Sequence, residues 1–182
     1  MKNFLFLADG FEEIEALATV DILRRAEMDV TTVSINHNNV VTGAHGVPVV
    51  ADVTFKEADF SDCDWLILPG GMPGAANLHD HHELTSLLKV HADKGRIAAI
   101  CASPAVVLAA TGLLEGRKAT CYPGFDTALV AAGAIHEDKR VVVDGNIVTA
   151  NGPASATVFA LEIVRLTRGD QAADSVAAGM LC

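Results

Sequence analysis

Short apolar runs of strand length alternate along this chain with longer stretches in which apolar residues recur at the spacing of a helix. Such alternation is typical of a sheet covered by helices on both faces. The pattern therefore predicts an α/β fold with a mostly parallel sheet. Predicted strands cover residues 2–8, 30–35, 40–42, 47–51, 65–68, 96–100, 140–143 and 147–150, and predicted helices cover residues 12–27, 84–92, 104–110, 154–166 and 170–179.

Turn and cap residues mark several of these boundaries. Asp9 and Glu12 resemble a capping box before the first helix. Gly112 is placed to end the helix that starts at residue 104. The turn Asp144-Gly145-Asn146 between two apolar runs predicts a hairpin, and the two short runs that precede residue 52 predict a second hairpin outside the main sheet.

Composition narrows the class of protein. The chain has 182 residues, of which 51% are hydrophobic, so we expect a sizeable core and one domain spanning residues 1–182. A formal net charge of −10 disfavours nucleic acid as a partner. No apolar run reaches the length of a membrane span, and the first residues form a strand-like run rather than a signal peptide. The four cysteines lack the spacing of metal ligands or of a disulfide framework, so we expect a cytoplasmic location.

Cys101 is the residue that points most directly to chemistry. It follows the apolar run 97–100 and precedes small residues and a helical run, so the sequence places it at a strand-to-helix turn of the nucleophile-elbow type. Backbone N–H groups and the positive end of a helix favour the thiolate, and we therefore expect a thiol pKa well below 7. The alternative interpretation is a small buried hydrophobic residue.

A glycine-rich loop, Pro69-Gly70-Gly71-Met72-Pro73-Gly74, follows the predicted strand at 65–68. Ligands of open parallel sheets lie beyond the carboxyl ends of the strands, so this loop is expected near Cys101. Adjacent glycines can direct backbone N–H groups at an oxyanion. An ordinary tight turn is the alternative, and a phosphate-binding P-loop is disfavoured because its spacing and its lysine are missing.

Three glutamates, Glu12, Glu13 and Glu15, open the first predicted helix. The helix dipole is enough to explain Glu12 and Glu13. Glu15 differs because apolar residues flank it on both sides. Burial raises the pKa of a carboxyl group, so Glu15 is expected to keep its proton and to donate a hydrogen bond to a sulfur anion.

Several ordered motifs run through nearly the whole chain. They are Gly10-Phe11-Glu12-Glu13-Ile14-Glu15-Ala16, Val20-Asp21-Ile22-Leu23-Arg24-Arg25-Ala26, Leu68-Pro69-Gly70-Gly71, Gly74-Ala75-Ala76-Asn77-Leu78, Ala98-Ala99-Ile100-Cys101-Ala102-Ser103-Pro104 and Gly152-Pro153. Together they resemble the ThiJ/PfpI superfamily, in particular its Parkinson-disease deglycase branch. The resemblance implies a flavodoxin-like three-layer sandwich and a homodimer formed through the first helix. It also implies a protonated Glu15 hydrogen-bonded to Cys101, and an oxyanion site made by the backbone of Gly70, Gly71 and Ala102.

Two departures from the family pattern bear on the mechanism. Tyr122 stands where human-type relatives carry a histidine near the cysteine, so we expect Tyr122 to hydrogen-bond a substrate oxygen in place of histidine-assisted proton transfer. Ala102 stands where the peptidase branch places a histidine. Proteolysis is therefore disfavoured, because a thiolate without a nearby base has no ready proton donor for an amine leaving group.

Other residues are secondary candidates. The resemblance puts Arg25 near the pocket, with a solvated helix face as the alternative. His45 falls where relatives have a pocket arginine, with an exposed turn as the alternative. The stretch Asn151-Gly152-Pro153 follows the last strand and completes the predicted pocket. The stretch His79-Asp80-His81-His82-Glu83 is interpreted as the polar opening of a helix, and no metal site is expected there.

The sequence thus predicts an enzyme in which Cys101 attacks small reactive carbonyl compounds without a cofactor or metal. The resemblance supplies the substrates, which are methylglyoxal, glyoxal or early glycation adducts. The alternative is a redox sensor or stress-protective protein whose Cys101 is oxidised to a sulfinate stabilised by Glu15. A role in thiazole biosynthesis rests only on the family's historical name.

Overall fold

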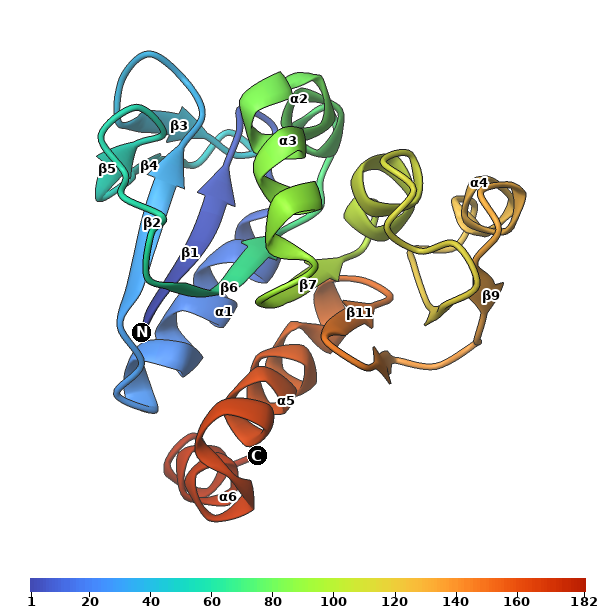
Figure 1. Cartoon of the computed structure of the whole chain (residues 1–182). Coiled ribbons are helices and arrows are strands. Elements are labelled where there is room, and N and C mark those ends of the chain that lie inside the picture. The colour runs from blue at the N-terminus through green and yellow to red at the C-terminus, as the bar shows by residue number, and fades with distance from the viewer.

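A central sheet of seven strands organises the molecule, and the computed structural model describes all 182 residues (Figure 1). Across the sheet the strand order is β10-β11-β7-β6-β1-β2-β5. All neighbouring strands are parallel except β10 and β11. The predicted α/β fold is therefore confirmed. The strands are β1 (Lys2–Leu7), β2 (Val30–Ser34), β5 (Val53–Thr54), β6 (Cys63–Leu68), β7 (Arg96–Ile100), β10 (Val141–Asp144) and β11 (Ile147–Ala150).

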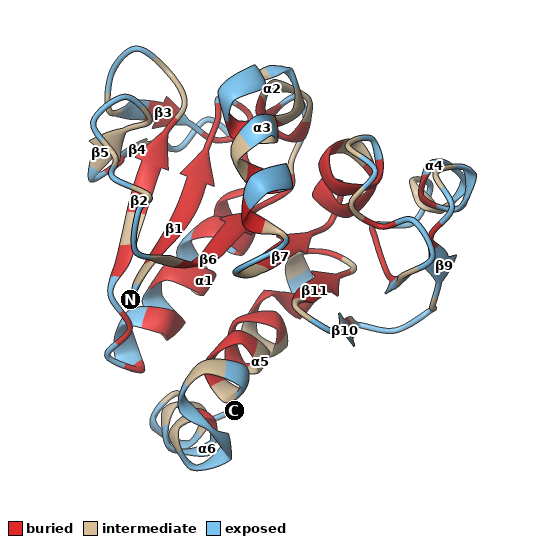
Figure 2. Cartoon of the chain, in the orientation of Figure 1, coloured by how far each residue is buried: buried red, intermediate tan, exposed pale blue.

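Helices cover both faces of this sheet, because successive side chains of a strand point to opposite faces. In β1, Leu5 and Leu7 belong to one apolar core, and Phe4 and Phe6 belong to a second core on the other side. Figure 2 shows the buried strands between these helices. The predicted three-layer arrangement is confirmed. One face carries α1 (Glu13–Arg25), α5 (Ala156–Arg168) and α6 (Asp170–Gly179), and the other carries α2 (Gly74–Asp80), α3 (His82–His91), the π-helical segment η1 (Pro104–Ala109) and α4 (Asp126–Ala131).

Both predicted hairpins form. One joins β10 to β11, and the other joins β3 (Val40–Thr42) to β4 (Pro48–Val50) outside the main sheet. The sequence did not predict α2, α4, β5 or the two-residue strands β8 (Lys118–Ala119) and β9 (Ile135–His136), because elements this short show little periodicity. No helix combines the length and the apolar character needed to cross a bilayer.

The predicted capping box at the start of α1 is wrong. Glu12 itself caps the helix, and its Oε2 accepts a hydrogen bond of 2.7 Å from the backbone N–H of Glu15. Asp9 instead accepts from the backbone N–H of Thr42, at the end of β3. Gly10, with a φ of 85°, turns the chain between Asp9 and the helix, so the two side chains do not meet.

Candidate active site

Cys101 occupies a sharp turn between β7 and η1. Its φ of 66° lies in the left-handed region, which non-glycine residues rarely adopt. Hydrogen bonds of 2.8 Å hold this backbone on both sides, from Cys101 N–H to the carbonyl of Ala150 and from Tyr122 N–H to the carbonyl of Cys101. The structure thus has the strand-to-helix turn that the sequence predicts, and neighbouring strands fix its conformation.

Glu15 and Cys101 meet at Gly70. Glu15 lies in the first turn of α1 and is fully buried. Its Oε2 accepts a hydrogen bond of 2.7 Å from Gly70 N–H, and its Oε1 is buried without a hydrogen-bond partner. A Cβ atom on Gly70 would lie 2.6 Å from Cys101 Cβ and 2.8 Å from Glu15 Oε2. Only glycine therefore allows the loop, the carboxyl group and the cysteine to come so close.

Burial dominates the electrostatics of this pair. It raises the pKa of Glu15 to about 7, while the Gly70 N–H and the Cys101 side chain oppose the shift. Burial and, after it, the charge of Glu15 raise the pKa of Cys101 to about 12, although the N–H groups of Gly71 and Ala102 oppose this rise. The expected low thiol pKa is therefore not an intrinsic property of the turn. Because a proton on Glu15 removes the repulsion, the thiolate forms more readily when Glu15 holds the proton.

The predicted oxyanion donors divide into two groups. The N–H groups of Gly71 and Ala102 are directed at the Cys101 sulfur, and both stabilise negative charge there. Gly71 has a φ of 88°, and a Cβ atom on it would lie 2.4 Å from Glu12 N. The N–H of Gly70 is instead engaged by Glu15. The prediction that Gly70 donates to the oxyanion is therefore corrected, since one N–H cannot serve both acceptors at full strength.

The loop after β11 lies beside Tyr122. A Cβ atom on Gly152 would lie 3.0 Å from the Tyr122 ring, and the Tyr122 side chain is partly exposed. Asn151 Oδ1 accepts a hydrogen bond from Ser155 Oγ, and Pro153 opens the short helix η2 (Pro153–Ser155). Tyr122 and Gly152 thus flank the elbow, while the Asn151 oxygen is held within its own loop.

Comparison with known proteins identifies the family of this chain. A family model described as the DJ-1/PfpI family matches residues 1–166. The chain belongs to the DJ-1/PfpI family. It is 35% identical to Protein dj-1beta of Drosophila melanogaster over 97% of this chain and 95% of that protein, and 32% identical to Deglycase PH1704 of Pyrococcus horikoshii over 92% of this chain and 100% of that protein. The predicted ThiJ/PfpI resemblance is confirmed.

Solved structures of the DJ-1/PfpI family share the fold. The structure of oxidized Toxoplasma gondii DJ-1 has a TM-score of 0.94 and 40% identity, covering 99% of this chain and 97% of that one. Among curated relatives, Protein DJ-1 homolog A of Arabidopsis thaliana is 39% identical over 96% of this chain. The chain spans less than half of the two Arabidopsis relatives that it matches, at 45% and 36% of their lengths.

Arg25 does not join this DJ-1/PfpI site. It lies in the last turn of α1, about 15 Å along the helix axis from Glu15 by the rise of an α-helix. Its side chain is half exposed and forms an ion pair of 2.7 Å with Asp21. Within the single chain, the structure therefore supports the solvated helix face rather than a pocket position.

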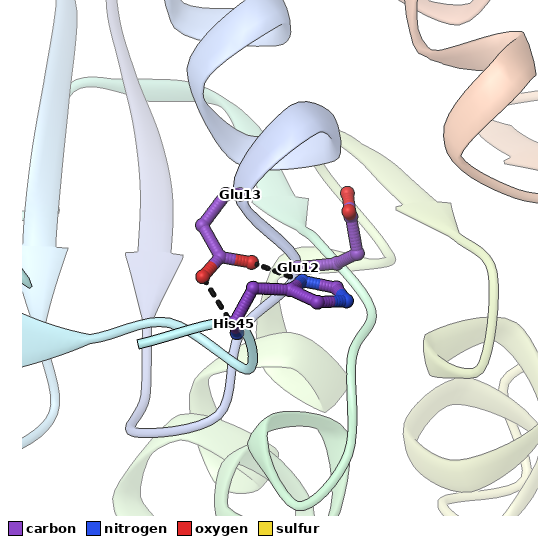
Figure 3. Close-up of side chains that lie close together, drawn as sticks. All are labelled: Glu12, Glu13 and His45. Atoms are coloured by element: carbon purple, nitrogen blue, oxygen red, sulfur yellow. Dashed lines mark hydrogen bonds and ion pairs between the residues drawn. The ribbon is translucent and has the colours of Figure 1, made fainter. Parts of the chain in front are cut away.

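His45 lies in the β3–β4 hairpin and pairs with Glu13 (Figure 3). Its Nδ1 lies 2.8 Å from Glu13 Oε2, and its backbone N–H donates to Glu13 Oε1 at 2.7 Å. One side-chain atom each of Glu12, Glu13 and His45 that could bind a metal lies within 4.8 Å of the other two. These three side chains are therefore close enough together to hold a metal ion. Helix capping by Glu12 and hairpin anchoring by Glu13 already explain both carboxylates.

The polar stretch before α3 has the structural role expected of it. His81 caps this helix, with Nδ1 accepting a hydrogen bond of 3.2 Å from the backbone N–H of Leu84. The sequence did not single out Ser103, whose buried hydroxyl donates to the carbonyl of Pro69 at 2.5 Å. Its position two residues after Cys101 was the only available signal, because the contact joins segments 34 residues apart.

Proposed function

We propose that this chain is a cofactor-independent enzyme that uses Cys101 to convert small reactive carbonyl compounds, such as methylglyoxal and glyoxal, or early glycation adducts. The observation that carries the proposal is the meeting of Cys101 and the buried Glu15 at Gly70. A nucleophile beside an acid whose pKa is raised to about 7 is suited to proton transfer near neutral pH. The name Deglycase, borne by the Pyrococcus relative, supports the substrate class.

The proposed reaction starts from the state in which Glu15 is protonated and Cys101 is a thiolate. The sulfur adds to the aldehyde carbon of methylglyoxal, and the carbonyl electron pair moves to oxygen. Gly71 and Ala102 N–H groups stabilise that oxyanion, and Glu15 then protonates it to give a hemithioacetal. Tyr122, whose backbone N–H donates to the Cys101 carbonyl, would contact a second substrate oxygen.

The second half of the reaction uses the ionised Glu15 as a base. It removes the proton from the hemithioacetal carbon and delivers it to the neighbouring carbon, while the proton of the hemithioacetal hydroxyl moves to the oxygen of that neighbouring carbon. The first carbon becomes a thioester on Cys101 and the second carries a hydroxyl group. Water then cleaves the thioester, releases lactate and restores the thiol. The overall change adds one water to methylglyoxal, so no redox cofactor is required.

We also propose that two copies of the chain pair through α1. Ile14 and Leu17 are exposed apolar residues on this helix, and Val50 is exposed on β4. Exposed apolar side chains of this size favour association with a second surface.

All four cysteines are free, which suits the cytoplasmic location expected from the sequence.

A redox-sensing function is the second candidate. It is favoured by the related Toxoplasma gondii protein, whose solved structure is that of an oxidized form. Peroxide would oxidise the Cys101 thiolate to a sulfenate and then a sulfinate, with water as the reduced product of each step. The same Glu15 proton would hydrogen-bond the sulfinate, so turnover is needed to separate the two functions.

The test measures lactate release from methylglyoxal in the wild type, Cys101→Ser, Glu15→Gln and Cys63→Ser. We expect steady turnover by the wild type, loss of at least a hundredfold in Cys101→Ser and Glu15→Gln, and normal turnover in the Cys63→Ser control. Equal activity of wild type and Cys101→Ser would refute the enzyme. Absent turnover together with selective oxidation of Cys101 by dilute peroxide would support the sensor.

A further inference from the structure

Two successive peptide groups of the glycine-rich loop connect the elbow to α1. In the Pro69–Gly70 peptide, the carbonyl accepts a hydrogen bond from Ser103 Oγ and the N–H donates to Glu15 Oε2. In the Gly70–Gly71 peptide, the carbonyl accepts from Glu12 N–H at 2.9 Å and the N–H is directed at the Cys101 sulfur. Each peptide is therefore held at its carbonyl end and presents its N–H to a reacting group.

Ser103 supplies the side-chain donor in this arrangement that comes from the elbow. It is fully buried, so its hydroxyl cannot exchange the Pro69 carbonyl for water. Its φ of −62° and ψ of −33° are ordinary helical values, so the backbone does not demand a special residue at this position. The side chain, rather than the backbone conformation, accounts for a serine here.

Hydrogen bonds at the two ends of one peptide group reinforce each other. A donor at the carbonyl oxygen polarises the peptide and makes its N–H a stronger donor. A stronger N–H stabilises the ionised form of the carboxyl group that it contacts. Among the contacts of Glu15, the Gly70 N–H is the largest influence that opposes burial. A change in the hydrogen bond to the Pro69 carbonyl therefore alters how strongly the Gly70 N–H stabilises the ionised form of Glu15.

We propose that Ser103 is a positioning residue: its hydroxyl orients and polarises the Pro69–Gly70 peptide and so controls how readily Glu15 releases its proton. The consequence for turnover rests on the proposed function, in which Glu15 first donates a proton and then takes one up. The proton equilibrium itself needs no substrate, so it can be measured whether or not the chain turns over a carbonyl compound.

The experiment follows the infrared band of the protonated Glu15 carboxyl group as pH is raised. Loss of the band in Glu15→Gln assigns it. We expect Ser103→Ala to move the midpoint upward by about half a unit, because the Gly70 N–H becomes a weaker and less well oriented donor. Ser103→Thr keeps the hydroxyl and is expected to keep the wild-type midpoint.

Two further variants separate positioning from stability. Ser103→Gly removes the same hydroxyl without adding a methyl group, and it reports the midpoint if Ser103→Ala does not fold. Thr111→Ala removes another hydroxyl that donates to backbone carbonyls, at the end of η1, and is expected to leave the midpoint unchanged.

An unchanged midpoint in Ser103→Ala and Ser103→Gly, accompanied by a lower melting temperature, would assign Ser103 a structural role and overturn the proposal. An equal shift in folded Ser103→Thr and Ser103→Ala would overturn it as well. Failure of the wild type to convert methylglyoxal would defeat the proposed function and leave this titration interpretable.

Discussion

Buried charged groups have different surroundings at the two ends of the central sheet. At the amino end, Arg96 forms a bidentate ion pair with Asp64 and donates to the carbonyl of Leu166. The guanidinium carbon of Arg96 also lies 4.7 Å from the centre of the Trp65 ring. At the carboxyl end, Glu15 keeps one buried oxygen without a partner, beside a cysteine in a strained backbone conformation. The charged pair at the amino end is satisfied by the protein itself, whereas the carboxyl end is prepared for a reacting group.

The surface hollows lie at the other end from this chemistry. Two hollows of about 360 and 660 Å³ share Met1, Asp64 and Arg96, and neither includes Cys101. The size of a depression is therefore a poor guide to the reactive site here. An unpartnered buried carboxyl oxygen beside a non-glycine residue of positive φ locates it more directly, and this combination occurs at Glu15 and Cys101.

One thiol at each end, the half-buried Cys63 and the buried Cys101, sharpens the comparison. Burial and, after it, the charge of Asp64 raise the pKa of Cys63 to about 12. Burial and Glu15 have the same effect on Cys101. The difference lies in the acids, since Asp64 forms an ion pair with Arg96, whereas the pKa of Glu15 is raised to about 7 by burial. Cys101 therefore has a neighbour that can hold a proton near neutral pH and so relieve the repulsion.

The largest effect on stability is expected from Arg96→Met, at the amino end. Removing the arginine leaves Asp64 mostly buried without its partner, which costs about 3 kcal/mol of the free energy of unfolding. The melting temperature should fall by about 6–12 °C. Urea and thermal unfolding measure this loss, and iodoacetamide labelling of Cys101 in the folded protein should stay within twofold of the wild-type rate.

Arg168→Met is the matched control, because Arg168 is half exposed and its Nη2 lies 3.9 Å from Oε2 of the exposed Glu27. Its effect on stability should be within about 0.5 kcal/mol. A slower labelling rate in folded Arg96→Met would contradict the division of roles between the two ends of the sheet.

The sequence was sufficient for the layers and for the position of the elbow. Alternating apolar runs predicted both faces of the sheet, and the run 97–100 before Cys101 placed the turn. These features depend on local patterns that every strand and helix repeats. The parallel order of the strands then brings loops distant in sequence to one edge.

Details that depend on contacts between distant segments could not be predicted from the local sequence pattern. The N–H of Gly70 serves Glu15 rather than an oxyanion, and Asp9 serves β3 rather than α1. The expectation of a low thiol pKa took account of the helix end and the nearby N–H groups but not of burial, which has the largest influence on the pKa of Cys101. Spacing along the chain gives none of these quantities, because each is set by the tertiary neighbours.

A smaller effect on stability but a clear effect on chemistry is expected from Gly70→Ala. The new Cβ would lie 2.6 Å from Cys101 Cβ and 2.8 Å from Glu15 Oε2, so the loop must move away from both. We expect a loss of about 2 kcal/mol of stability from overpacking. Lactate release from methylglyoxal should fall at least tenfold. Gly179→Ala is the control, because a Cβ there meets nothing within 4 Å, and normal activity of Gly70→Ala would refute the packing argument.

The smallest effect concerns the pair Glu13–His45, which unlike Asp64–Arg96 depends on a proton. Although burial opposes it, hydrogen bonds from His45 lower the pKa of Glu13, and the bond to Glu13 raises the pKa of His45. The Glu13 contribution is present above its ordinary value of 4.5 and is lost as pH falls through the lowered pKa. The His45 contribution is present below its ordinary value of 6.5 and is lost as pH rises through the raised pKa.

The stabilisation that His45→Ala removes should therefore be greatest between about pH 4.5 and 6.5 and should decline on both sides of that window. Because His45 is largely exposed, water and salt weaken the pair, so the difference in melting temperature should be small and should shrink further at high ionic strength. Melting curves of wild type and His45→Ala across pH measure it, with His37→Ala, another exposed histidine, as the control. A difference that does not vary with pH would show that His45 stabilises the hairpin through packing, and the pair would then resemble Asp64–Arg96 after all.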